Sequence, residues 1–76
     1  MNNARRKSLR EIADKISALR DELEALKNEE EEYYENMPES FQAGEKGDRA
    51  QEVIDMLDTA CCSLEEAADN IEQSAE

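Results

Sequence analysis

Residues 35–48 read ENMPESFQAGEKGD, and this stretch holds Pro38, Gly44 and Gly47, which are all the proline and glycine of the chain. These two residue types interrupt regular structure more strongly than any others. Charged segments of similar length lie on either side of the stretch. We therefore expect a joint at 37–45 between two long elements.

Inside the joint, the spacing of Asn36 and Glu39 is that of a capping box, and Pro38 falls near the first turn. A short helical turn is therefore expected to run through Phe41 as far as Gly44.

On both sides of the joint, apolar residues recur at alternating spacings of three and four, which is typical of a coiled-coil seam. The first seam runs through Leu9, Ile12, Ile16, Leu19, Leu23, Leu26, Glu30, Tyr33 and Met37. The second runs through Ala50, Val53, Leu57, Ala60, Leu64, Ala67, Ile71 and Ser74. The pattern predicts one helix at about 5–36 and another at about 46–74.

Two helices of similar length with a short connection lie antiparallel. The predicted fold is an all-α antiparallel two-helix hairpin of coiled-coil type, forming a single domain over residues 1–76. The apolar stripe of the second helix is too wide for one neighbour to cover, so we expect a homodimer that forms a four-helix bundle. Its predicted interface consists of Ile54, Leu57, Cys61, Leu64, Ala68 and Ile71.

The net charge of −12 is distributed unevenly. Residues 1–20 hold six basic and two acidic residues, for +4, whereas residues 21–76 hold three basic and nineteen acidic residues, for −16. An acidic body repels nucleic acid and anionic lipid. The expected partners are therefore a second copy and a basic protein, with no direct nucleic-acid binding and no membrane contact.

Several classes of protein find no support in the composition. No apolar run approaches the roughly 20 residues that span a bilayer, and the polar N-terminus does not resemble a signal peptide, so a cytoplasmic protein is expected. The chain has no histidine, no EF-hand pattern and no glycine-rich phosphate loop. Cys61 and Cys62 are adjacent and point about 100° apart on a helix, so they are expected to be reduced thiols that bind no metal, with Cys61 packed on the apolar stripe. The alternative is a redox role or an intersubunit disulfide. We expect no enzyme, no metal and no cofactor.

The run of four glutamates at 29–32, followed by two tyrosines, is mostly a solvated helix face. Glu30 alone falls on the seam, where a carboxylate must reach solvent or a base of another chain. Tyr34 and Phe41 lie where an aromatic side chain could cover the end of the bundle or contact a partner. The candidate partner-contact residues are Glu30, Tyr34 and Phe41.

The joint sequence Asn36-Met37-Pro38-Glu39-Ser40, followed by Gly47 and an acidic, alanine-rich helix, resembles a group of uncharacterised short acidic helical-hairpin proteins of bacterial phages and integrated elements. The resemblance implies a phage or mobile-element accessory protein. It implies no catalytic or binding residue.

The expected function is that of a small acidic protein–protein interaction module. The alternative is a nucleic-acid mimic, an inhibitor of the anti-restriction or anti-CRISPR type. A helix of about 29 residues is about 43 Å long, and duplex DNA of that length carries about 25 phosphates. A dimer would carry 2 × −12 = −24 charges.

Overall fold

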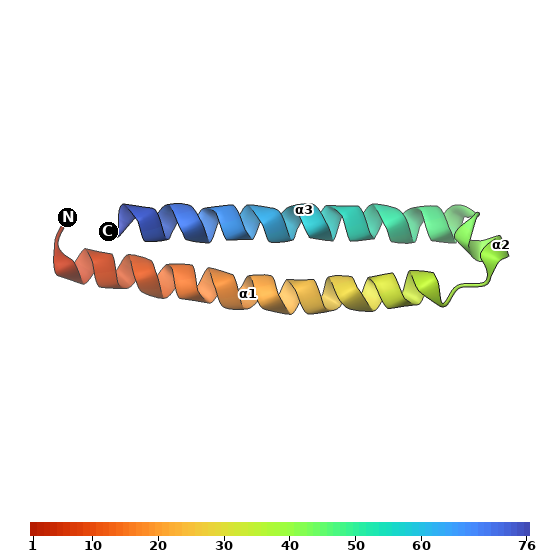
Figure 1. The fold of residues 1–76 in the computed structure, drawn as a ribbon, viewed down its shortest axis with the longest axis horizontal. Coiled ribbons are helices and arrows are strands. Elements are labelled where there is room, and N and C mark those ends of the chain that lie inside the picture. The colour runs from red at the N-terminus through yellow and green to blue at the C-terminus, as the bar shows by residue number, and fades with distance from the viewer.

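The computed structural model describes residues 1–76 and contains three helices: α1 (Asn3–Glu35), α2 (Glu39–Gln42) and α3 (Glu45–Ser74) (Figure 1). The two long helices, α1 and α3, pack side by side in opposite directions, and α2 forms the turn between them. The molecule is a rod of 59 × 14 × 12 Å, with both termini at the end away from α2. The predicted all-α fold with two long packed helices is confirmed.

The ends of the helices have different caps. α1 begins after Asn2, whose side-chain oxygen accepts a hydrogen bond from the backbone N–H of Arg5 at 2.7 Å. The expected short helical turn is present as α2, but the predicted capping box of Asn36 and Glu39 is not formed. Asn36 ends α1, because its backbone N–H donates to the carbonyl oxygen of Glu32, and the N-cap of α2 is Pro38, which makes no side-chain cap.

Two residues tie the joint together. The side-chain amide of Gln42 donates to the carbonyl oxygens of Tyr34 at 2.9 Å and Glu35 at 3.4 Å, so α2 satisfies the open C-terminal end of α1. Gly47 is buried where α2 crosses α3. A Cβ atom at Gly47 would lie 2.0 Å from the carbonyl oxygen of Gln42, so the crossing requires glycine.

The edge of α1 that faces α3 differs from the predicted seam. About half of that seam is placed as expected and is half-buried: Leu9, Ile16, Leu23, Glu30 and Met37. The other half is exposed by 46–56 %: Ile12, Leu19, Leu26 and Tyr33. The inner positions belong instead to the residues that follow each of these: Ala13, Arg20, Lys27 and Tyr34.

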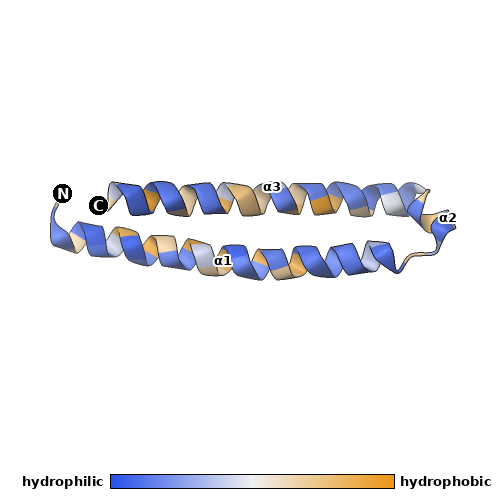
Figure 2. Ribbon diagram, viewed as in Figure 1, coloured by the Kyte–Doolittle hydropathy of each residue, from blue (hydrophilic) through white to orange (hydrophobic).

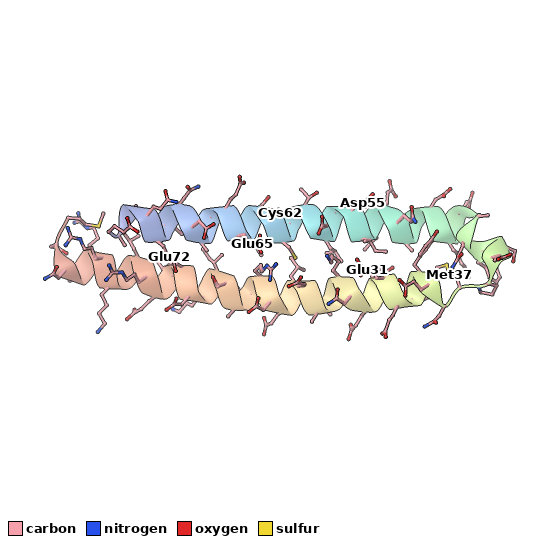
Figure 3. The ribbon with its side chains drawn as sticks, in the orientation of Figure 1. Glu31, Met37, Asp55, Cys62, Glu65 and Glu72 are labelled. Carbon is pink, nitrogen blue, oxygen red and sulfur yellow. The ribbon has the colours of Figure 1, made fainter.

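Side-chain size and reach explain this rotation. The residues of α3 buried against α1 are all small, namely Ala50, Cys61 and Ala68, so the two helices can approach closely along this edge. Arg20 and Lys27 can lay their aliphatic stems on the edge while their charged ends reach acidic residues of α3. The Arg20 Nη2 atom lies 2.5 Å from Glu65 Oε1, which points from α3 towards α1 (Figure 3). Lys27 Nζ lies 3.2 Å from Asp58 Oδ1.

These ion pairs define one antiparallel alignment. One heptad forward along α1, from Arg20 to Lys27, corresponds to one heptad back along α3, from Glu65 to Asp58. The same alignment brings Arg10 to the C-terminal end of α3. The basic N-terminal segment therefore lies beside the acidic C-terminal one.

The core between the helices is small. Only six residues are buried, and none is large: Ala13, Gly47, Ala50, Cys61, Ala68 and Ala75. Apolar residues are interspersed with polar ones along both long helices (Figure 2). The accessible surface is 5643 Å², whereas a compact protein of 8.7 kDa exposes about 4,700 Å². The hairpin therefore exposes about 900 Å² more than a globular monomer of its mass.

Candidate protein-interaction surface

Four large apolar side chains form a line along the outside of α1. Ile12, Leu19, Leu26 and Tyr33 recur one heptad apart and are about half exposed. We call them the α1 stripe. Single exposed apolar residues are ordinary, whereas a line of four along one helix is a candidate contact surface. The stripe comes from the predicted seam, whose alternate positions the structure turns outward.

The neighbouring edge of α3 carries no charge from Val53 to Ser74, whereas Lys46 and Arg49 occupy the same heptad positions at its N-terminal end. Val53, Ala60 and Ala67 are half-buried, Met56 is 53 % exposed, and Ser63, Asn70 and Ser74 are exposed. These positions match the α1 stripe in heptad phase, and in an antiparallel pair such matching positions lie on the same side. The ion pairs of Arg20 and Lys27 occupy the opposite side. We call the α1 stripe with Val53, Met56, Ala60 and Ala67 the apolar face.

The residues predicted for the dimer interface lie elsewhere. Cys61 and Ala68 are buried, and the other four are half-buried: Ile54, Leu57, Leu64 and Ile71. Their spacing places all six on the side of α3 that faces α1. They are therefore engaged within the hairpin, whereas the α1 stripe and Met56 remain about half exposed.

The three predicted partner-contact residues separate into two groups. Glu30 and Tyr34 are half-buried, and the backbone carbonyl of Tyr34 accepts a hydrogen bond from Gln42. Phe41 is 49 % exposed. The exposed tyrosine is Tyr33, one residue before the predicted one, and it lies with Phe41 at the same end of the rod.

These two aromatic residues line a shallow groove at the joint. Its volume is about 330 Å³, and its lining residues are Tyr33, Asn36, Met37, Pro38, Phe41 and Lys46. Lys46 Nζ lies 5.3 Å from the centroid of the Phe41 ring, within the range of a cation–π interaction. A second hollow of about 270 Å³ also uses Tyr33, together with Glu30 and Arg49. Tyr33 therefore connects the joint groove to the α1 stripe.

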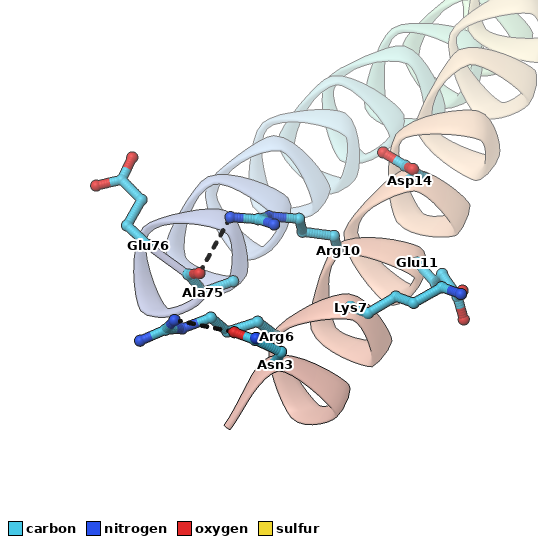
Figure 4. Close-up of a pocket in the computed structure, with 8 residues that line it drawn as sticks. All are labelled: Asn3, Arg6, Lys7, Arg10, Glu11, Asp14, Ala75 and Glu76. Carbon is cyan, nitrogen blue, oxygen red and sulfur yellow. Dashed lines mark hydrogen bonds between the residues drawn. The ribbon is translucent and has the colours of Figure 1, made fainter. Parts of the chain in front are cut away.

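The opposite end of the rod brings basic side chains of α1 together with acidic ones. A hollow of about 390 Å³ lies there, lined by Asn3, Arg6, Lys7, Arg10, Glu11, Asp14, Ala75 and Glu76 (Figure 4). Arg10 Nη2 donates to the carbonyl oxygen of Ala75 at 3.2 Å, so it caps the C-terminal end of α3. Arg6 donates to the side chain of Asn3, and its Nε atom is buried without a hydrogen-bond partner. None of the basic side chains before residue 20 forms an ion pair within 4.0 Å.

Sequence reasoning did not identify the two charged residues of the inner edge. Arg20 lies 2.6 Å from Glu24 and 3.2 Å from Asp21 as well as close to Glu65. The hydrogen bond with Asp21, together with the nearby carboxylates, raises the pKa of Arg20. Both Arg20 and Lys27 directly follow a seam position.

Alkaline pH tests the Lys27 pair. Its hydrogen bond with Asp58 raises the pKa of Lys27 above 10.5. Since the folded-state pKa is raised, the pair stabilises the fold fully below pH 10.5 and this contribution is lost as the pH rises through the raised value. The melting temperature of the natural protein should therefore exceed that of a Lys27→Met variant at neutral pH, and the difference should shrink above pH 10.5. A difference that stays constant across this range would contradict the role assigned to Lys27.

The remaining reactive groups are few. No group of three or more His, Cys, Asp and Glu side chains is placed to hold a metal ion. Cys61 is a buried free thiol and Cys62 an exposed one. None of the helices has both the length and the apolar character that crossing a membrane requires. What the surface offers is apolar, aromatic and charged contact.

Comparison with protein-family models, with curated proteins and with solved structures finds no match to this chain. Function is therefore argued from its residues and their arrangement.

Proposed function

We propose that the chain is a small acidic protein–protein interaction module that associates with itself as a homodimer and binds a basic partner protein, without catalysing a reaction. The observation that carries this proposal is the mismatch between the core and the surface. No large side chain is fully buried, yet Ile12, Leu19, Leu26, Tyr33, Phe41 and Met56 are about half exposed. A chain of this size gains stability by burying such groups in an assembly.

The self-associated form proposed is a four-helix bundle made of two hairpins. Within it the acidic sides of α3 would remain at the surface, where they would attract a basic protein. The joint groove with Tyr33 and Phe41 lies at the tip of each hairpin and offers the aromatic contacts that protein interfaces favour. A cytoplasmic accessory protein of a phage or mobile element fits this description and the resemblance of its NMPES joint.

Light scattering at micromolar concentration, with circular dichroism on the same sample, tests the self-association. The expected mass is 2 × 8.7 = 17.4 kDa with a strongly helical spectrum. Because only the folded dimer gains from association, the melting temperature should rise with protein concentration. A helical species of 8.7 kDa whose melting temperature does not depend on concentration would contradict the homodimer.

A nucleic-acid mimic is the second candidate, and the charge of α3 favours it. Between Gln51 and Glu76 the chain has eight acidic residues and no basic one. As an acidic decoy the protein would occupy the basic groove of a DNA-binding protein. Its binding should then compete with duplex DNA and weaken steeply with salt. Binding that persists in high salt and in the presence of DNA would instead favour apolar contact through the joint groove.

A further inference from the structure

We infer that the second copy docks on the apolar face through a two-fold axis perpendicular to the rod, so that the two α1 helices lie antiparallel and the two joints lie at opposite ends. The inference rests on the proposed self-association and specifies its geometry. Three properties of the hairpin support it: the area it leaves exposed, the symmetry of its apolar face and the distribution of its charge.

The exposed area has the size that a stable dimer needs. The hairpin exposes about 900 Å² more than a compact protein of its mass, and a standard protein interface buries about 800 Å² on each partner. One second copy would therefore bring the exposed surface per chain to that of a compact protein. The apolar face is the region where the exposed surface includes a continuous line of large apolar side chains.

The α1 stripe is symmetric about its own centre, and so is the central pair Ala60 and Ala67 of the α3 edge. Along α1, Ile12 and Tyr33 are centred between residues 22 and 23, as are Leu19 and Leu26. Along α3, Ala60 and Ala67 are centred between residues 63 and 64. The pairing of Arg20 with Glu65 sets these two centres side by side to within about one residue, or ~1.5 Å of helix rise.

A single two-fold axis can therefore cross both helices at the centres of their apolar lines. Such an axis places Leu19 against Leu26 of the second copy, and Ile12 against Tyr33 of the second copy. Each large side chain of the α1 stripe then meets another large one. The two copies of α3 meet along their uncharged edges, so these acidic helices approach each other without placing carboxylates in contact.

Charge complementarity selects this orientation. Residues 1–20 carry +4, whereas residues 21–36 hold eight acidic residues and one basic residue, for −7. An antiparallel pair of α1 helices lays the basic half of each along the acidic half of the other. Lys15 and Glu29 flank the α1 stripe on the same edge, both are exposed, and neither forms an ion pair within the hairpin. The axis brings each Lys15 to Glu29 of the second copy, twice per dimer.

The competing bundle has its two-fold axis along the rod. It places α1 against α3 of the second copy, with both joints at one end. The edge of α3 that would then face Lys15 and Glu29 carries Met56, Ser63 and Asn70, none of which is charged. This arrangement leaves Lys15 and Glu29 without a charged partner. Exchanging the charges of these two residues therefore distinguishes the two arrangements.

The test is a charge exchange measured as the dissociation constant of the dimer, by sedimentation equilibrium at low ionic strength. Lys15→Glu and Glu29→Lys should each weaken the dimer about tenfold, because each turns two attractions into two repulsions. The double variant restores opposite charges and should recover the natural affinity to within about threefold. High salt should reduce all three effects.

The matched controls are Lys7→Glu and Glu35→Lys, singly and together. Both positions are exposed and share a heptad phase on the side of α1 away from the apolar face. The single controls change the net charge as the test variants do, so they measure general repulsion, and the double control should bring no specific rescue. Glu22 provides a further test. It lies at the axis, so it faces Glu22 of the second copy, and this pair of carboxylates should repel. Glu22→Gln removes the repulsion and should tighten the dimer more than Glu35→Gln does.

The outcomes are distinct. Loss of affinity in the two test variants with recovery in the double variant supports the inferred orientation. A natural protein that is dimeric, but whose test variants behave like the controls, overturns the orientation and leaves the proposed homodimer intact. A natural protein that is monomeric overturns both, and it assigns the apolar face to a different chain.

Discussion

Replacing Gly47 with alanine is expected to destabilise the protein by about 1–3 kcal/mol, which is the usual cost of forcing an extra methyl group into a packed site. The new Cβ would lie 2.0 Å from the carbonyl oxygen of Gln42 and 2.5 Å from its carbonyl carbon. Both are backbone atoms, so α2 must move off α3. Gln42 would then lose its hydrogen bonds to the end of α1. The melting temperature should fall by about 10 °C.

The sign of this effect is informative, because intrinsic helix propensity favours alanine over glycine by about 1 kcal/mol inside a helix. Gly44→Ala is the matched control. A Cβ at Gly44 would meet its nearest atom, the carbonyl oxygen of Ser40, at 3.4 Å, so only the cost of the poorer N-cap is expected, about 0.5–1 kcal/mol. A Gly47→Ala protein that is as stable as the natural one would contradict the crossing of α2 over α3.

Replacing Leu26 with aspartate is expected to weaken the dimer about a hundredfold or more, since each dimer loses two apolar contacts and must desolvate two carboxylates. Leu26 is 55 % exposed in the hairpin, so the substitution removes little packing within one chain. At micromolar concentration the variant should have a mass of 8.7 kDa. Its helicity should also fall, because the separated hairpin has a core of only small side chains.

Ala25→Asp provides the control for Leu26→Asp. Ala25 is the neighbouring residue, it is exposed, and it lies on the side of α1 away from α3. The added charge and the poor helix propensity of aspartate are therefore the same in both variants. If both variants dissociate equally, the added charge alone separates the chains. That result would contradict the assignment of Leu26 to the interface.

The antiparallel hairpin could be predicted from sequence because the signals for its joint and its two helices are local. Pro38, Gly44 and Gly47 mark the joint, and heptad spacing marks two helices of similar length. The predicted N-cap of α2 was wrong because an asparagine such as Asn36 is equally compatible with the end of one helix and the start of the next. The need for Gly47 depends on where α2 crosses α3, which no local pattern describes.

The rotation of α1 was not predicted because apolar spacing identifies only the apolar residues. Leu9, Ile16 and Leu23 belong to both possible seams, so the choice falls to the residues on either side. Small buried residues of α3 and carboxylates within reach of Arg20 and Lys27 decide it. A pattern that counts charged side chains as outward-facing cannot assign Arg20 to an inner edge.

The exposed apolar surface differs from the predicted interface for the same reason. Once Arg20 and Lys27 take inner positions, Leu19, Leu26 and Tyr33 turn outward, and the predicted interface residues of α3, such as Cys61, turn towards α1. On the same side of α3, the apolar residues that α1 does not fully cover are Val53, Met56, Ala60 and Ala67. Phe41 was assigned to the exposed tip, where the structure places it, but its aromatic neighbour in the groove is Tyr33.

Small-angle X-ray scattering tests the central claim, the side-by-side dimer formed through the apolar face, most directly, because it reports mass and length on one sample. We expect a mass of 2 × 8.7 = 17.4 kDa and a longest dimension close to the 59 Å of one hairpin. Two rods packed along their apolar faces double in thickness and not in length. A mass of 8.7 kDa, or a doubled mass in a particle approaching twice that length, would contradict it.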